Sequence, residues 1–209
     1  MKIIFIGKQG SGKGTYAEVL SKKHNLPHIS TGEMFREMAK ENSELGKKVK
    51  ELIDAGNLVP DDITISVLKE RFKKEDCKNG FVLDGFPRNL VQAQALEEIT
   101  DINFAFHLKI SDETAVKRLS ARRQCRHCAK IFNLITNPPR NNGKCDCNGE
   151  LYQREDDKED AIKKRLASYK SEEEDLIEFY HSILKTVDAE KPIEAVVNAL
   201  ESYISELKH

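Results

Sequence analysis

The chain has 209 residues, enough for one α/β domain of ordinary size with a sizeable hydrophobic core. Its 34 lysines and arginines nearly balance its 35 aspartates and glutamates, which excludes the strongly basic composition typical of nucleic-acid-binding proteins. The apolar runs are much shorter than the roughly 20 residues that cross a bilayer, and the N-terminus lacks a signal-peptide pattern. We therefore expect a cytoplasmic protein that binds neither nucleic acid nor membrane.

Strand-like and helical segments alternate along the chain. Five segments have the apolar pattern of buried strands: Lys2–Ile6, Pro27–Ser30, Phe81–Asp84, Phe104–Ile110 and Leu184–Asp188. Helices are predicted at Thr15–His24, Gly32–Lys40, Ser43–Ala55, Asp61–Lys74, Leu90–Ile99, Asp112–Arg123, Asp160–Tyr169, Glu172–Ile183 and Pro192–Leu207. This order predicts an α/β fold with a five-stranded parallel sheet between two helical layers. Ligands of such folds bind at the carboxyl ends of the strands.

A glycine-rich stretch joins the first predicted strand to the first helix. Residues Gly7 to Thr15 contain four glycines and Lys13. In such a loop, backbone N–H groups turn inward around a polyphosphate, and the helix dipole favours an anion. Lys13 supplies a positive charge, and a hydroxyl, expected to be that of Thr15, can reach Mg2+ or a phosphate. The general pattern has Ser or Thr where this chain has Gly14. A glycine-rich turn without a ligand is the alternative, but the strand and the helix favour a nucleoside polyphosphate site.

Seven arginines lie near the ends of predicted elements: Arg36, Arg88, Arg118, Arg122, Arg123, Arg154 and Arg165. A planar guanidinium binds phosphate oxygens through two parallel hydrogen bonds, which an ammonium cannot do. Each arginine taken singly fits an exposed charge with a carboxylate partner better than a functional role. Gathered around a phosphate loop, several of them are expected to act together on phosphates.

Four of the five cysteines fall in a stretch from Gln124 to Tyr152 that has little helical period. They form two pairs: Cys125 and Cys128, then Cys145 and Cys147. The spacing nearly fits a two-knuckle zinc template, and four thiolates suit a structural Zn2+. The second pair is one residue shorter than usual, so Asp146 or His127 is open as a substitute ligand, and four reduced thiols without metal are the alternative. Cys77 lies apart and is expected to be a buried apolar residue.

At this point the chain resembles the adenylate kinase family, in its long form with a cysteine-bearing lid. The matching segments are Gly7–Thr15, Ser30–Arg36, Gly56–Asp61, Leu83–Arg88, Arg122–Arg123, Asn137–Pro139, Tyr152–Asp157 and Lys164–Leu166. The resemblance implies a P-loop three-layer core over residues 1–209, with a helical AMP-binding insertion at 30–60 and a zinc-ribbon-like lid at 122–154. It also implies reversible phosphoryl transfer from Mg-ATP to AMP, giving two ADP, by a monomer in nucleotide homeostasis.

The resemblance further implies a role for each matching residue. The expected ATP site is Gly10, Ser11, Gly12, Lys13, Gly14, Thr15, Arg118, Arg122, Ile131, Phe132 and Lys191. The expected AMP site is Thr31, Arg36, Asn57, Leu58, Val59, Gly85, Phe86, Pro87, Arg88, Gln92, Arg154 and Arg165. The groups expected at the reacting phosphates are Lys13, Asp84, Arg88, Arg122, Arg154 and Arg165, with Asp84 holding Mg2+ through water. The expected zinc ligands are Cys125, Cys128, Cys145 and Cys147, and Phe86–Pro87 is expected to be a cis peptide.

Two other functions stay open. A kinase for UMP, CMP or GMP would keep the phosphate loop and the arginines. Thr31, Val59 and Gln92 resemble the AMP pattern, yet one amide does not settle the identity of the base. A zinc-ribbon nucleic-acid-binding module fused to an ATP-binding domain would need a basic face and stacking aromatics, and few aromatics lie near the cysteines.

The C-terminal part of the chain departs from the family pattern in two places. Glu173–Leu176 stands where the family usually has a Thr-x-Pro-Leu type turn, and Ala189 replaces a common glycine. The register of the last strand and the expected adenine contact at Lys191 are therefore left open.

Overall fold

The computed structural model describes residues 1–141 and 143–206. Its central sheet contains β1 (Lys2–Ile6), β2 (His28–Ser30), β3 (Phe81–Asp84), β4 (Phe104–Lys109) and β8 (Leu184–Asp188). The strand order is β2-β3-β1-β4-β8, and every neighbouring pair is parallel. The predicted five-stranded parallel sheet is confirmed. In the last strand, Asp188 pairs with Lys109 of β4, so β8 lies at the edge of the sheet.

The helices are α1 (Lys13–His24), α2 (Thr31–Met38), α3 (Glu44–Asp54), α4 (Asp61–Phe72), α5 (Leu90–Ile99), α6 (Asp112–Ser120), α7 (Glu159–Phe179) and α8 (Ile193–Glu206). Short 3-10 turns cover Glu75–Cys77 and Glu155–Asp157. Within the described ranges, no helix has both the length and the hydropathy to cross a membrane.

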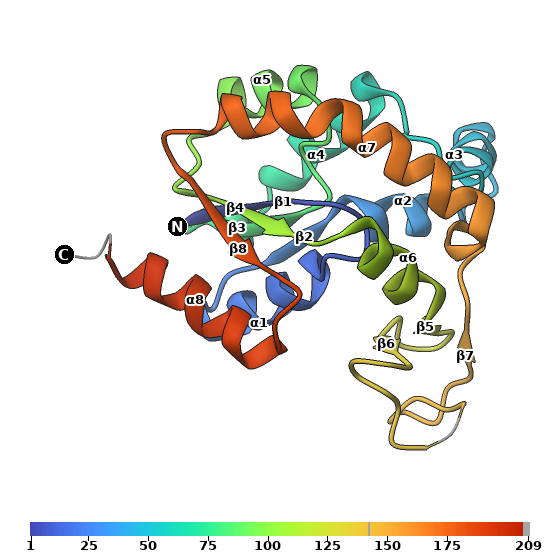
Figure 1. The fold of residues 1–209 in the computed structure, drawn as a ribbon. Helices are drawn as coiled ribbons and strands as arrows, with labels where there is room; N and C mark the ends of the chain where they lie inside the picture. Colours follow the sequence, from blue (N-terminus) through green and yellow to red (C-terminus); the bar gives the residue numbers. More distant parts are fainter. Residues whose placement is uncertain (142, 207–209) are drawn as a thin grey trace.

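The central sheet is covered on both faces, with α1 and α8 on one side and α4, α5 and α7 on the other (Figure 1). Successive strand residues point to opposite faces, so β1 contributes to two separate cores. Ile3 and Phe5 pack in the cluster that contains residues of α1 and α8. Ile4 and Ile6 pack in the cluster that contains residues of α4, α5 and α7. Burial on both faces explains why the strands read as nearly continuous apolar runs.

Two predictions about helix boundaries are corrected by the structure, and a third falls on a residue that the structure does not describe. The predicted helices Asp160–Tyr169 and Glu172–Ile183 are one 21-residue helix, α7, whose sequence contains neither Gly nor Pro to break it. The helix predicted to end at Arg123 ends at Ser120, because the chain enters a strand at Arg122. Leu207, the predicted end of the last helix, lies outside the described residues.

A second, smaller sheet lies between α6 and α7. It consists of β5 (Arg122–Cys125), β6 (Ile131–Asn133) and β7 (Leu151–Tyr152), in the antiparallel order β6-β5-β7. Figure 1 shows it projecting away from the central sheet. Its core is small: Cys125, Phe132 and Cys145 are buried, and Leu151 packs against them. So few apolar side chains cannot offset the ordering of some thirty residues, which predicts a cross-link within this unit.

Candidate active site

A cavity of about 1220 Å3 opens at the carboxyl ends of the central strands. Its wall contains the glycine-rich loop, the start of α2, the segment after β3, the small sheet and the segment before α8. All the residues expected to bind nucleotides line it, except Ser11 and Phe86. Both of these side chains are buried away from the cavity. The structure therefore brings together residues that are up to about 180 positions apart in the sequence.

The glycine-rich loop has a backbone that only glycine adopts without strain. Gly12 has φ 96°, and a Cβ placed there would lie 2.7 Å from Cε2 of Tyr16. Gly14 has a different reason, because a Cβ there would lie 3.2 Å from Oδ2 of Asp84. At the position that usually carries Ser or Thr, the backbone thus lies close to a carboxylate that a side chain would crowd. Thr15 lies exposed in the cavity wall, one helical position further on.

Lys13 reaches back along the loop that precedes it. Its Nζ donates hydrogen bonds to the carbonyl oxygens of Gly7, at 2.5 Å, and Lys8, at 2.8 Å. Burial lowers the pKa of Lys13 from 10.5 to about 7. The carboxylate of Asp84 opposes this shift. Three guanidinium groups lower the pKa of Lys13 further, those of Arg88, Arg165 and Arg122. The empty site therefore holds a lysine that an anion would recharge.

Two arginines of the cavity pair with carboxylates of the 3-10 turn before α7. Arg122 binds Asp157 through two hydrogen bonds, from Nε at 2.7 Å and from Nη2 at 2.5 Å. Arg165 donates to Oδ2 of Asp156 at 2.8 Å. Asp157 is fully buried, and its two hydrogen bonds fix the orientation of the Arg122 guanidinium. These pairs hold both guanidinium groups at the cavity wall.

Two more arginines share Glu33 of α2. Arg36 and Arg154 each place Nη2 at 2.8 Å from Oε1 of Glu33, and Gln124 lies 3.4 Å from its Oε2. Burial alone would raise the pKa of Glu33, but the two arginines outweigh it and hold that pKa below its ordinary value. Because Arg154 and Gln124 belong to the small sheet and its flank, Glu33 ties this unit to α2.

Arg88 differs from these four, since its Nε donates to the backbone carbonyl of Gly85 at 2.8 Å. Among the described residues, it has no carboxylate within ion-pair distance. Burial lowers its pKa, as it does for Arg154 and Arg165. A guanidinium stays protonated nonetheless, so Arg88 offers the cavity a charge that no carboxylate contacts directly, with Asp84 as the main negative charge nearby.

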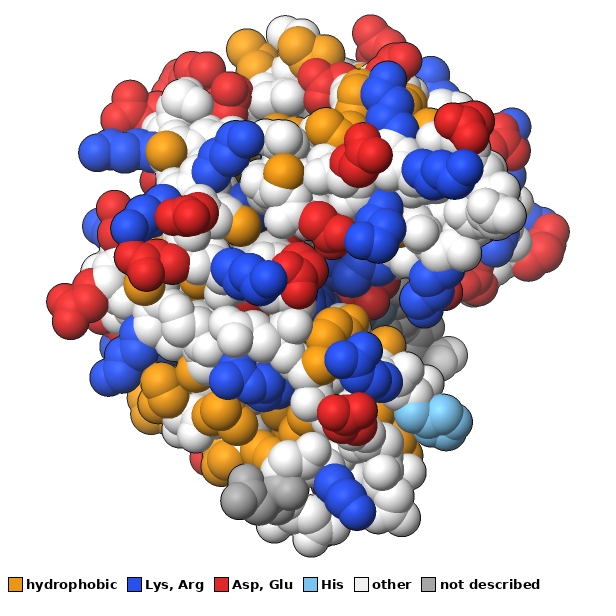
Figure 2. Space-filling view, turned by 90° about the vertical axis from the view of Figure 1, so that its right-hand side faces the viewer, with side chains coloured by type: hydrophobic (Ala, Val, Ile, Leu, Met, Phe, Trp, Pro, Cys, Tyr) orange, Lys and Arg blue, Asp and Glu red, His pale blue; other side chains and the backbone are white. Residues whose placement is uncertain are grey.

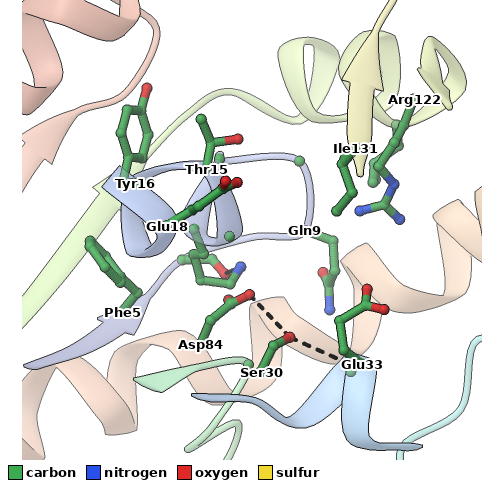
Figure 3. A pocket seen from close by; sticks show the side chains of 18 of the residues that line it. Phe5, Gln9, Thr15, Tyr16, Glu18, Ser30, Glu33, Asp84, Arg122 and Ile131 are labelled. Carbon is green, nitrogen blue, oxygen red and sulfur yellow. Dashed lines mark hydrogen bonds between the residues drawn. The ribbon is translucent and has the colours of Figure 1, made fainter. Parts of the chain in front are cut away.

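The start of α2 is fixed by Ser30, which lies between Asp84 and Glu33 in Figure 3. Ser30 Oγ donates to Asp84 Oδ2 at 3.5 Å and accepts from the Glu33 N–H at 3.4 Å, as a helix N-cap. Thr31 Oγ1 donates to the carbonyl of Gly85 at 2.9 Å. The peptide bond Phe86–Pro87 that follows is cis, as expected.

The comparisons with known proteins agree with this geometry. The family model described as adenylate kinase matches residues 5–185. The chain belongs to the adenylate kinase family. It is 49% identical to the adenylate kinase of Thermosipho africanus, over 98% of this chain and 99% of that protein. It is 45% identical to that of Archaeoglobus fulgidus over the full length of both, and 50% identical to that of Caldicellulosiruptor bescii over 86% of each.

The opposite wall of this adenylate kinase cavity is built from α6, β6 and the segment before α8. It contains Arg118, Ile131, Phe132 and Lys191, all expected from the resemblance. Ile131 is 38% exposed, whereas Phe132 is buried in the core of the small sheet. Ile131 therefore offers an apolar surface to the cavity, and Phe132 supports it from behind.

The four cysteines of the small sheet converge. Their Sγ atoms all lie within 4.8 Å of one another, with separations of 3.4, 3.5 and 3.6 Å for three of the pairs. Tetrahedral Zn2+ with Zn–S bonds of about 2.3 Å requires S–S separations of about 3.8 Å, so the four thiols fit this metal. Asp146 is not drawn in as a ligand, because its carboxylate pairs with Lys130 at 2.5 Å. Cys77 is buried in the main core, as expected.

Four acidic residues of the site were not predicted from the sequence: Glu33, Asp61, Asp156 and Asp157. Three of them bind arginines of the cavity and the fourth binds Gln92. A signal existed for Glu33, since Glu33 and Arg36 lie three residues apart on one helix face. For the other partners the sequence carries no comparable spacing.

Proposed function

We propose that the cavity binds ATP along the glycine-rich loop and AMP between α2 and the segment after β3. Family membership assigns the reaction: reversible transfer of a phosphoryl group from ATP to AMP, giving two ADP. The assignment of ATP and AMP to different sides depends on one observation. Lys13 lies on the loop, whereas Arg36, Arg88 and Gln92 lie on the other wall of the same cavity.

On the ATP side, the N–H groups of residues 10–15 would surround the phosphates, with the charge of Lys13 on the group that is transferred. Asp84 lines the cavity beside Gly14 of the loop, which suits a carboxylate that holds the water shell of Mg2+. Asp84 would hold Mg2+ through water, and the chemistry that the ion would supply when bound is positive charge against the phosphates. Arg118 and Ile131 would lie against the adenine or the ribose.

On the AMP side, Arg36 and Arg88 would bind the phosphate, and Thr31, Val59 and Gln92 would contact the base. The attacking group is an AMP phosphate oxygen, which is already ionised at neutral pH because the second pKa of a phosphate is about 6. No general base is therefore required. Charge on the transferring group would be stabilised by three further arginines, Arg122, Arg154 and Arg165.

We further infer that residues 122–154 act as a lid, with residues 30–60 as a second moving region over AMP. The contact of Arg154 with Glu33 joins the two regions across the cavity. Closure on both nucleotides would exclude water, which otherwise competes with AMP as the acceptor. The four cysteines would hold a structural Zn2+ that replaces the missing core of the lid.

The rival function of a nucleic-acid-binding module finds no support on the face that carries the small sheet. Figure 2 shows charged side chains of both signs interspersed there, with hydrophobic side chains gathered toward the bottom. The exposed apolar residues of the small sheet and its loop are Ile131, Leu134 and Ile135. A nucleic-acid site would instead need a continuous basic stripe.

The test is a coupled assay of ADP formation from Mg-ATP, with AMP, UMP, CMP and GMP offered separately. Activity with AMP at least 100-fold above the others is expected. Preference for another monophosphate would contradict the assignment of the base pocket and leave the phosphate mechanism intact. Zinc content by elemental analysis, expected at one per chain, tests the metal proposal independently, and a metal-free native protein would contradict it.

A further inference from the structure

Gln92 is a buried amide in the cavity wall, and its two ends have partners of opposite kind. Its Oε1 accepts a hydrogen bond from the backbone N–H of Arg88 at 2.8 Å. Its Nε2 donates to Oδ1 of Asp61 at 2.7 Å. The side chain is only 2% exposed, so water does not substitute for either partner. The amide is thus held by a pure donor on one end and a pure acceptor on the other.

These partners forbid the reversed orientation of the amide. A flip would place the Gln92 carbonyl against the Asp61 carboxylate and its NH2 group against the Arg88 N–H. Two hydrogen bonds would be lost, one of them to an ion, and two repulsive contacts would replace them. Asp61 is itself fixed, because Asn89 Nδ2 donates to both of its oxygens, at 3.1 and 3.2 Å.

Asn89 also connects this group to the backbone of Gln92. Its Oδ1 accepts the Gln92 N–H at 2.8 Å as the N-cap of α5. Asp61 lies in the first turn of α4. The carboxylate therefore joins the starts of two helices and sets the direction of the amide that lies between them and the cavity.

Each end of the amide keeps one unused hydrogen-bonding position. An amide NH2 group has two hydrogens, and a carbonyl oxygen has two lone pairs. In Gln92 one hydrogen and one lone pair are already used in the hydrogen bonds to Asp61 and Arg88. Among the described residues, neither atom has a second partner. The free positions form a donor and an acceptor side by side at fixed places. A ligand that fits must present an acceptor to Nε2 and a donor to Oε1.

Adenine meets this requirement with N1 as the acceptor and the 6-amino group as the donor. The 6-oxo purines reverse it, because O6 is an acceptor and N1–H a donor. They would match only the flipped amide, which Asp61 and the Arg88 N–H together oppose. A site built to hydrogen-bond one pattern rejects its inverse strongly, since buried groups are then left unpaired.

We propose that Asp61 is the specificity-determining residue of the monophosphate site, selecting 6-amino over 6-oxo purine nucleotides by fixing the polarity of the Gln92 amide. This rests on the proposed AMP site and deepens it. Asp61 acts through Gln92 and is a positioning residue. Its effect is a discrimination of roughly 5- to 150-fold, the range for one bidentate amide–base pair.

The test compares AMP with IMP, which differs only in the 6-substituent and the N1 proton. In Asp61→Asn the new amide can meet either end of the Gln92 side chain, so the Arg88 N–H alone holds the amide polarity, and the ratio of kcat/KM for AMP to that for IMP should fall about tenfold or more. Most of the change should appear in KM for the monophosphate, while KM for Mg-ATP stays the same. A structural defect would instead lower both rates together and leave the ratio unchanged.

Asp62→Asn is the matched control, because Asp62 lies in the same first turn of α4 but is exposed. Its ratio should stay within twofold of wild type. If Asp61→Asn does not fold, judged by circular dichroism, Asp61→Ser replaces it with the same expected direction. A ratio unchanged in the folded Asp61 variant overturns the proposal. Failure of the wild-type enzyme to use AMP at all would instead overturn the proposed function.

Discussion

The pKa of Lys13 predicts that ATP binding takes up a proton above neutral pH. With a pKa of about 7 in the empty site, only about one-tenth of Lys13 is protonated at pH 8. A bound polyphosphate places several negative charges beside Nζ and raises this pKa again. Binding at pH 8 should therefore take up about 0.9 proton per site. The dissociation constant should rise about tenfold between pH 8 and 9, or about 1.4 kcal/mol.

The sign of the stability effect follows from the same shift. The folded-state pKa of Lys13 lies below its unfolded value of 10.5, so the unfolded chain binds more protons between about pH 7 and 10.5. The contribution of this group to stability thus rises with pH across that window. Nucleotide binding cancels the effect, because it restores the charge. The empty and loaded enzymes should consequently differ in the pH dependence of their melting temperatures.

The assay is calorimetric titration of ATP, without AMP, in buffers of different ionisation enthalpy at pH 8. The slope of the observed enthalpy against the buffer's ionisation enthalpy gives the number of protons taken up. The phosphates of ATP are already ionised at pH 8 and add little. Lys13→Arg, whose side chain stays charged, should show no uptake and a flat pH profile whatever its affinity. Uptake near zero in the wild type, with a constant affinity from pH 7 to 9, would refute the reasoning.

Three further predictions concern the arginines and the cysteines. Arg88→Lys keeps the charge but loses the planar fork, so kcat/KM for AMP should fall roughly 10- to 150-fold, the range for hydrogen bonds to a charged group, with KM for ATP unchanged in steady-state kinetics. Glu33→Gln removes the charge shared by Arg36 and Arg154, so the separation of the small sheet from α2 in the nucleotide-free enzyme should increase, measured between paired labels; an unchanged distance distribution would contradict this latch. Cys145→Ser should release the metal and abolish amide-exchange protection in residues 122–152 while the central sheet stays protected; equal loss in both regions would show that the small sheet has no separate stability.

The central fold was predictable because its inner strands β1, β3 and β4 are buried on both faces. Apolar runs such as Ile3–Ile6 between helical patterns leave few alternatives to a parallel sheet. The failures lie where tertiary context decides. The unit after α6 begins with Arg122 and Arg123, which read as the end of a charged helix but begin β5, the central strand of the small sheet. The continuous α7 was missed because a break was predicted between Tyr169 and Glu172, where Lys170 and Ser171 do not interrupt a helix that contains neither Gly nor Pro.

The cationic side chains of the candidate site could be predicted from the sequence, but the carboxylates with which they pair could not. Glycine-rich loops and arginines carry their own signal, because few other residues do the same chemistry. The carboxylates that hold those arginines carry none, since Asp and Glu are common on every exposed helix. Asp157 is the clearest case: it reads as one of a run of charges, yet it is fully buried against Arg122. Only the fold decides which carboxylate of such a run turns inward.

The pairing of cations explains how the cavity exists without a nucleotide. Arg36, Arg122, Arg154 and Arg165 would repel one another in one cavity, but Glu33, Asp156 and Asp157 offset most of their charge and hold each of the four in place. The orientation that phosphate needs is thus prepared before binding, which lowers the entropy cost of assembling the site. Arg88 and Lys13 form no such ion pair: both donate to backbone carbonyl groups, and burial lowers the pKa of Lys13 to about 7. We therefore expect a phosphate on the proposed AMP side to bind an already charged Arg88, and ATP on the proposed other side to raise the pKa of Lys13.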